Sequence, residues 1–348
     1  MTVGTVYAQT GETKIQKIKN AFQSESFQLS GYAHIQYNIS EYPERSSVPG
    51  KTNNSIDITR AFLFASGKIG EKNQFGYMVM FDFGPNAKLH ELYGEWLPNK
   101  AINVRFGQFK VPFTIENPIS LSRIETIHVS RSTAAMSGGT GDFNQWDPDG
   151  KIVNKCGRDA GLQLYGSLFP IDNFFRVDYY AGLFNGTGMN TKDNNNHKNF
   201  LGTAYVYPVK AFKLGGSFYS GKYPQYMQEY LQSGNNLSAN RWSIGAEYKG
   251  AQLSSRAEYI AAKDGDLKRN GYYGLLVWKF IPNQWEAVGK YDHYDKNTEI
   301  KGNDINDFTF GINYYFAYLS RIQVNYIYTD NKSEGKNNAL AIQLQVWF

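Results

Sequence analysis

The chain has 348 residues, of which 36 are basic and 31 acidic, so its formal net charge is +5 at neutral pH. Aromatic residues make up 16% of the chain, yet its mean hydropathy is only -0.50. No run approaches the roughly 18 apolar residues of a membrane-spanning helix, and the single cysteine, Cys156, excludes an internal disulfide or a cysteine-rich metal site. The basic residues form no run and are interspersed with acids, so we expect no nucleic-acid partner.

The first residues suggest a processed N-terminus. Residues 1–8 end in Val6-Tyr7-Ala8, an A-x-A-like pattern typical of the end of a secretory signal peptide. We interpret residues 1–8 as a residual signal-peptide tail, residues 9–25 as a periplasmic N-terminal segment and residues 26–348 as one barrel domain. An ordinary disordered N-terminus is the alternative, because short apolar ends are common.

From residue 26 onward, apolar and polar side chains alternate with the period of a two-faced β-strand. In residues 27–37, for example, Leu29 and Ile35 fall on one face, whereas Gln28 and His34 fall on the other. Sixteen segments follow this pattern: 27–37, 55–69, 73–83, 89–97, 102–112, 158–169, 174–183, 199–208, 211–220, 241–249, 252–261, 271–280, 284–293, 306–315, 319–329 and 340–348. The segment 271–280 is apolar on both faces, which indicates contact with a loop folded inward.

The apolar face of these segments is rich in Phe, Tyr and Trp, as expected of strands that face lipid. A soluble sandwich would instead turn its apolar face toward a packed core. A closed barrel pairs every backbone N–H and C=O group where no water is available. The sequence therefore predicts an all-β fold, a transmembrane antiparallel β-barrel of sixteen strands, with polar residues lining a water-filled lumen.

The connections alternate in length. Tight turns are predicted at 70–73, 98–101, 170–173, 209–210, 250–251 and 281–283. They alternate with mostly longer connections, which matches the short periplasmic turns and long extracellular loops of outer-membrane barrels.

The connection at residues 114–153 is the longest and the third on the long-loop side. Loops of this length are usually functional or disordered. If this loop folds into the lumen, it narrows the pore and places Arg123 and Arg131 at the constriction. The alternative is a solvated outer lid, because loops normally lie on the surface.

Cations are predicted on the inward face of many strands. These are Arg105, Arg176, Lys213, Arg241, Lys249, Arg256, Lys290 and Arg321, with Lys110 as a further candidate at the end of the fifth strand. Acids alternate with them: Asp82, Glu91, Glu95, Asp178, Glu247, Glu258 and Glu286. Cationic rings favour anions, but neighbouring opposite charges neutralise each other, so we expect at most a weak anion preference.

The sequence contains no catalytic or metal-binding motif. Five histidines are scattered along the chain, with no HExxH and no G-x-S-x-G. Ser120 or Ser122 with His128 could imitate a nucleophile and its base, but such residues are common in polar loops. We predict no enzyme activity, no cofactor and no metal.

Several strings resemble the phosphate-selective porin O and P family. The most specific is Gly107 to Phe113, GQFKVPF, which precedes the long loop; CGRDAGLQLYGSL at 156–168, GINYYF at 311–316 and IQVNYIY at 322–328 are similar to later strands. The resemblance implies a sixteen-stranded, often trimeric barrel in a Gram-negative outer membrane, with the loop after strand five folded into the channel. Phe348 is similar to the terminal aromatic of the assembly signal of this class. The arginine ladder of the family's phosphate channels is not evident here, although Arg105, Arg123 and Arg131 are partial counterparts.

The function predicted from these features is passive diffusion of small hydrophilic solutes, with at most a weak, phosphate-like anion preference. We expect contact with outer-membrane lipid and lipopolysaccharide, and assembly as a homotrimer. Two alternatives stay open: a barrel that acts with a surface lipoprotein in solute or glycan uptake, and a barrel hydrolase.

Overall fold

The computed structural model describes residues 24–40, 53–85, 87–137, 157–171, 175–193, 196–223, 237–333 and 335–348. The predicted signal-peptide tail, most of the predicted periplasmic segment and residues 138–153 of the long loop lie outside the described residues. No helix in the described part of the chain is long and apolar enough to cross a membrane.

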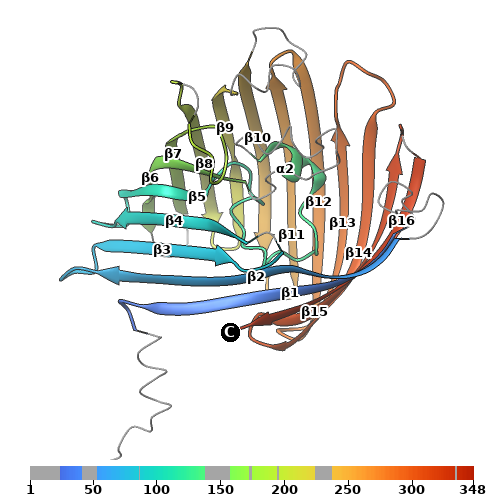
Figure 1. Ribbon diagram of the computed structural model, residues 1–348, viewed down its shortest axis with the longest axis horizontal. Coiled ribbons are helices and arrows are strands. Elements are labelled where there is room, and N and C mark those ends of the chain that lie inside the picture. The colour runs from blue at the N-terminus through green and yellow to red at the C-terminus, as the bar shows by residue number, and fades with distance from the viewer. Residues whose placement is uncertain are drawn as a thin grey trace, which may run out of the picture.

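The described residues form sixteen strands that close into one antiparallel barrel, as predicted. The strands are β1 (Gln28–Ser40), β2 (Asn53–Ile69), β3 (Phe75–Asp82), β4 (Lys88–Trp96), β5 (Asn103–Lys110), β6 (Arg158–Ile171), β7 (Phe175–Phe184), β8 (Asn199–Val209), β9 (Phe212–Lys222), β10 (Ser238–Lys249), β11 (Leu253–Asp264), β12 (Leu267–Ile281), β13 (Trp285–Asp295), β14 (Asp304–Ala317), β15 (Ser320–Asn331) and β16 (Gly335–Trp347). A short helix, α2 (Arg131–Met136), lies in the connection between β5 and β6. Figure 1 shows β1 to β5, blue to cyan, on one side of the barrel, and β9 to β13, olive to tan, on the other.

The barrel closes where β1 pairs with both β2 and β16. On the inward face, His34 of β1 lies opposite Arg60 of β2 and Gln345 of β16. The His34 ring and the Gln345 amide share a 2.8 Å hydrogen bond, and Gln36 donates one of 2.6 Å to Gln343. The polar face predicted for this strand therefore lines the lumen.

The connections between strands separate the two rims. On one rim, connections of two to six residues join β2–β3, β4–β5, β6–β7, β8–β9, β10–β11, β12–β13 and β14–β15. Gly31 and Phe348 exchange backbone hydrogen bonds at the same rim. The connection between β5 and β6, on the opposite rim, is the longest. Short turns of this kind face the periplasm in outer-membrane barrels.

Aromatic side chains form outward-facing clusters near both rims. Near the short-turn rim, ring centroids lie 5.5 Å apart for Trp278–Phe280, 6.3 Å for Phe280–Trp285 and 4.4 Å for Trp285–Tyr314. Nearer the opposite rim they lie 6.0 Å apart for Tyr272–Tyr291, 4.9 Å for Tyr291–Phe308 and 6.2 Å for Phe308–Tyr328. Aromatic residues bind the interface between water and hydrocarbon, so these clusters mark the two edges of the membrane-spanning band.

β12, the strand that is apolar on both faces, has an inward face with two different neighbours. Helix α2 contacts β11, β12 and β13, and Ser132 of α2 lies where a side chain on Gly271 would stand. Nearer the short-turn rim, Leu275 and Val277 form a buried apolar cluster with Val288 of β13. The first neighbour is the inward-folded loop expected from the sequence; the second cluster belongs to the barrel wall.

Candidate functional site

The connection after β5 folds into the lumen instead of covering the barrel from outside. The chain turns inward at Thr114, whose φ of 69° is a left-handed conformation that β-branched residues rarely adopt. Two hydrogen bonds hold the turn: the Asn117 N–H donates to the Thr114 hydroxyl at 3.0 Å, and the Tyr205 hydroxyl of β8 donates to the Thr114 carbonyl at 3.0 Å. The contacts offset the strain, so the inward direction of the loop is fixed at its first turn.

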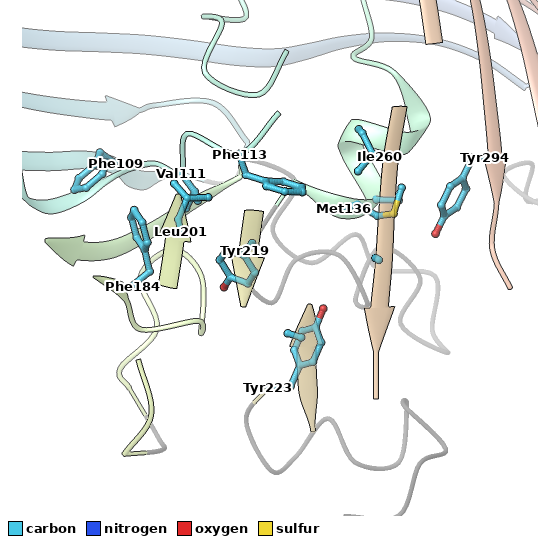
Figure 2. Close-up of a cluster of buried hydrophobic side chains, with 13 residues drawn as sticks. Phe109, Val111, Phe113, Met136, Phe184, Leu201, Tyr219, Tyr223, Ile260 and Tyr294 are labelled. Atoms are coloured by element: carbon cyan, nitrogen blue, oxygen red, sulfur yellow. The ribbon is translucent and has the colours of Figure 1, made fainter. Parts of the chain in front are cut away.

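An apolar cluster inside the lumen anchors the start of the loop. Val111, Phe113 and Met136 from the connection are fully buried. They belong to one cluster with inward-facing wall residues, which include Phe109, Phe184, Leu201, Tyr219, Ile260 and Tyr294 (Figure 2). Burial of this apolar surface is the main driving force that holds the loop inside the barrel.

Two predicted pore cations bind backbone carbonyl groups of the loop. The Lys110 ammonium donates to the carbonyls of Asn117 at 2.8 Å and Ile119 at 2.6 Å. Lys290 of β13 donates to the carbonyl of His128 at 2.9 Å. Both ammonium groups thus satisfy loop carbonyls that have no partner in regular secondary structure.

Arg321 of β15 binds the loop in the same way. Its guanidinium donates to the Ile124 carbonyl at 2.8 Å and to the Tyr315 hydroxyl at 3.0 Å, and its side chain is fully buried. Next to it, Gln323 donates to the Glu125 carbonyl at 3.1 Å. Side chains on the inward faces of β13 and β15 therefore bind the loop backbone through its carbonyl groups.

Arg256 of β11 is the centre of an ion-pair network between loop and wall. Its guanidinium lies 2.8 Å from Glu125 and 3.7 Å from Glu116 of the loop, and 3.2 Å from Glu247 of β10. The side chain is 1% exposed. A buried cation among three carboxylates is costly to remove, because the carboxylates would keep their charge without a partner.

The two predicted loop arginines lie in different surroundings. Arg131 pairs with Asp307 of β14 at 2.7 Å, and its backbone N–H donates to Asp292 of β13. Arg123 is exposed, and its guanidinium donates to the Tyr318 hydroxyl at 3.0 Å. Arg131 thus binds the loop to the wall, whereas Arg123 keeps most of its surface open.

The remaining predicted cations are paired with carboxylates along the wall. The pairs are Arg105–Glu95 at 2.7 Å, Arg176–Asp178 at 3.0 Å, Lys213–Glu247 at 2.9 Å and Arg241–Asp264 at 3.0 Å. The Arg241 side chain is fully buried, whereas that of Arg176 is 43% exposed. Asp264 is shared by Arg241 and Arg269, and Glu247 by Lys213, Lys249 and Arg256, so each of these cations has a carboxylate beside it.

A second group of cations, which includes three residues absent from the predicted set, lies on the wall of β2 to β6. Arg158, Lys88, Arg60 and Lys110 all act electrostatically on His90, a buried residue at a bulge in β4. We call these four cations the basic cluster. They come from four different strands and converge because the strands are neighbours in the barrel.

The acids of the same wall compensate only part of this charge. Glu91 pairs with Arg158 at 2.6 Å. Asp82 accepts backbone hydrogen bonds of 2.9 Å from Ala61 and Gly84. Among the described residues, the four cations of the basic cluster therefore have only these two carboxylates beside them.

Arg60 and Lys88 are the cations of this cluster that have no carboxylate partner among the described residues. Both are half-buried, and Arg60 occupies the inward face because it lies opposite His34. Sequence reasoning missed Arg60 because Phe62 and Phe64 share its face, and apolar residues were assigned to the lipid side. The pairing of His34 with Arg60 carries the missing signal, but it requires the register of β1 against β2.

The geometry is that of a channel, and the comparisons agree with it. The family model for phosphate-selective porin O and P matches residues 27–348. The chain belongs to the phosphate-selective porin O and P family. The described residues contain no group of three or more His, Cys, Asp or Glu side chains placed to hold a metal ion.

Solved porin structures share this fold. An anion-selective porin from Comamonas acidovorans is 14% identical, with a TM-score of 0.64 over 93% of this chain and 99% of that one. The outer membrane channel DcaP of Acinetobacter baumannii is 14% identical, with a TM-score of 0.58 over 92% and 97%. OmpT of Vibrio cholerae is 14% identical, with a TM-score of 0.56 over 94% and 99%. No curated protein sequence matches the chain significantly.

The family and the closed barrel establish the broad function predicted from the sequence. The protein is a porin of the bacterial outer membrane, a channel for passive diffusion of small hydrophilic solutes. Its lumen is divided between a wall that holds the loop and a wall that carries the basic cluster.

Proposed function

We propose that the porin conducts small anions with a modest preference over cations, and that the basic cluster of Arg60, Lys88, Lys110 and Arg158 carries this preference. The supporting observation is that Arg60 and Lys88 have no carboxylate partner among the described residues. The low-dielectric wall of a barrel focuses the field of such charges into the water-filled lumen. The anion-selective porin from Comamonas acidovorans, which shares the fold, is consistent with this assignment.

The inward loop sets the narrow part of the channel in this proposal. The loop backbone near Ile124 and His128 is bound by β13 and β15, so we infer that solutes pass between this part of the loop and the wall of β2 to β6. Arg123 is a further exposed cation, beside Tyr318 at the short-turn rim. Because most other lumen cations are paired, we expect general anion conduction, without the tight phosphate binding that an uninterrupted arginine ladder would give.

Reversal potentials in planar bilayers test the proposal. The porin in a KCl gradient should give discrete conductance steps and a reversal potential of the sign set by chloride. Arg60→Gln combined with Lys88→Gln removes both unpaired cations and should bring the reversal potential close to zero. A cation-selective wild-type channel, or an unchanged potential in the double variant, would overturn the assignment.

A matched control removes two cations from the outer rim. Lys301 and Lys336 are exposed and lie outside the lumen wall of β2 to β6. Lys301→Gln with Lys336→Gln changes the net charge of the protein by the same amount as the test variant. It should leave most of the reversal potential intact, because the charges are far from the passage and are screened by salt.

The proposal extends to assembly and surroundings. We expect the porin to form a homotrimer and to contact outer-membrane lipid and lipopolysaccharide through its aromatic clusters. We propose no catalytic role for Ser120, Ser122 and His128. The two serine hydroxyls share a hydrogen bond of 2.9 Å with each other, and the His128 carbonyl accepts hydrogen bonds from Thr126 and Lys290. Cross-linking in native membranes would test the trimer, and co-purification would test a lipoprotein partner.

A further inference from the structure

A band of tyrosine rings and ion pairs lines the lumen near the short-turn rim, across β4 to β8. Its members are the half-buried, inward-facing residues Tyr93, Glu95, Arg105, Tyr165, Tyr180, Arg176, Asp178 and Tyr207. We propose that this tyrosine band is a binding site for neutral ring saccharides on their way through the channel. The inference rests on the proposed function only in that the lumen is open to solutes.

The first half of the tyrosine band surrounds Arg105. Its guanidinium carbon lies 4.5 Å from the ring centre of Tyr93 and 5.0 Å from that of Tyr165. Glu95 pairs with Arg105 at 2.7 Å and accepts a hydrogen bond of 2.5 Å from the Tyr165 hydroxyl. The rings and the charged groups therefore hold one another in place, and the site is formed before any solute arrives.

The second half continues this arrangement on the next two strands. The rings of Tyr165 and Tyr180 are parallel, with centroids 6.1 Å apart and planes at 7°. Beyond them, the Arg176 guanidinium lies 3.9 Å from the centre of the Tyr207 ring and pairs with Asp178 at 3.0 Å. Aromatic faces and hydrogen-bonding edges thus alternate across the five strands β4 to β8.

A recess of about 400 Å³ adjoins the tyrosine band at the short-turn rim. Its inward-facing lining includes Gln28, Ser66, Lys68, Met78, Tyr93 and Glu95. The polar groups of Gln28, Ser66, Lys68 and Glu95 therefore surround the Tyr93 ring and the Met78 thioether. This size and this mixture of apolar surface with a few polar groups are typical of small-molecule sites.

Charge separates the tyrosine band from the basic cluster. Arg105 and Arg176 are each matched by one carboxylate, Glu95 or Asp178, so the band is close to neutral. An inorganic anion gains little there, because each guanidinium already has its partner. The band instead offers tyrosine faces to apolar surface and charged edges to hydrogen-bonding groups.

A pyranose ring has the complementary chemistry. Its C–H groups form an apolar face that stacks on a tyrosine ring, and its hydroxyls both donate to carboxylates and accept from guanidinium groups. An open-chain polyol has the same hydroxyls but no fixed flat face. Preference for a ring saccharide over such a polyol is therefore the property that the tyrosine band predicts.

Saturation-transfer NMR on the porin in a sugar-free detergent tests this property directly. Maltose should give a saturable signal that sorbitol does not give at the same concentration. In bilayers, maltose should also reduce the ion current beyond the viscosity effect shown by sorbitol. Tyr93→Leu and Tyr180→Leu should each lower the apparent maltose affinity about 3- to 10-fold, the loss of one stacked aromatic contact.

Two control variants separate stacking from general disturbance. Tyr165→Phe keeps the ring and removes only the hydroxyl, so it should retain most of the maltose binding. Tyr259→Leu changes a tyrosine on the lipid side of β11 and should bind maltose like the wild type. Equal signals from maltose and sorbitol, or wild-type affinity in both Tyr93→Leu and Tyr180→Leu, would overturn the saccharide site. Missing anion preference would contradict the proposed function instead, and the NMR result would stand independently.

Discussion

The two sides of the lumen use the same residue types for different purposes. On the covered wall, which we define as the inward faces of β11 to β16, Lys290 and Arg321 donate to loop carbonyls. In the basic cluster on the opposite wall, Arg60 and Lys88 have no carboxylate partner among the described residues. Lys290 and Arg321 thus hold the loop in position, whereas Arg60 and Lys88 leave their charge to act on solutes.

This difference shows that an inward-facing cation is not by itself a selectivity residue. Its effect on an ion depends on what else its N–H groups bind and on whether a carboxylate lies beside it. Arg256, for example, is inward-facing but fully engaged by carboxylates. Single substitutions on each wall therefore test whether the two kinds of cation differ in function.

The largest expected effect comes from Arg256→Met on the covered wall. The change leaves Glu116, Glu125 and Glu247 without their shared cation, and loss of one partner of a buried pair costs about 3–5 kcal/mol. The loop should detach, so that single-channel conductance rises and protease cuts the loop.

Lys249→Met is the matched control, because Lys249 also pairs with Glu247, at 3.1 Å, but is 62% exposed. An exposed pair contributes about 0–1 kcal/mol, so this variant should keep the wild-type conductance. If Arg256→Met kept a protease-resistant loop and unchanged conductance, the ion-pair network would not be what holds the loop.

Phe113→Ala tests the apolar anchor of the loop. Phe113 is fully buried in the cluster of Figure 2, and Phe→Ala in a packed core costs about 3–5 kcal/mol. The polar contacts of the covered wall remain, so we expect intermittent opening, seen as added current noise, instead of full release. Phe106→Ala is the control, since Phe106 lies on β5 but is 70% exposed on the lipid side; it should leave the noise unchanged.

The barrel was predictable from the sequence because lipid on one side and water on the other impose strict alternation along each strand. All sixteen predicted segments overlap a strand, and most ends differ by only a few residues. The register was not predictable. A bulge in β2 between Ile58 and Arg60 shifts the pairing with β1, so that Arg60 lies opposite His34 and Ile58 opposite Ile35. A second bulge, at His90, shifts the pairing of β3 with β4.

The path of the loop was only partly predictable, for a physical reason. Its length indicated a functional loop, but the groups that fix its path are backbone carbonyls such as those of Ile124 and His128. Every residue has such a carbonyl, so the sequence carries no signal for which ones the wall will bind. The donors were visible as lumen cations, and only the structure shows that they are already in use.

Removing one charge from each wall compares the two sides directly. Arg60→Gln should reduce the chloride preference clearly, because Arg60 faces the lumen and has no carboxylate partner among the described residues. Arg321→Gln should reduce it by less than half as much, since Arg321 is fully buried and bonded to the Ile124 carbonyl and the Tyr315 hydroxyl. Reversal potentials under one KCl gradient measure the chloride preference of both variants. Equal losses of chloride preference would mean that the contacts of Arg321 with the loop do not reduce the effect of its charge on passing ions.

The smallest effect is the salt dependence of the anion preference. It distinguishes long-range electrostatic attraction of anions from direct binding of anions to the cationic side chains. The Debye length is about 10 Å at 0.1 M salt and about 3 Å at 1 M, so a preference that arises from the field of Arg60 and Lys88 should shrink as salt rises at a fixed gradient ratio. The Arg60→Gln and Lys88→Gln double variant should show almost no change over the same range, because little preference remains to be screened. A wild-type preference that stayed constant with salt would indicate ions held in direct contact with the guanidinium and ammonium groups, since contact pairs in a narrow lumen are screened much less than charges acting across water.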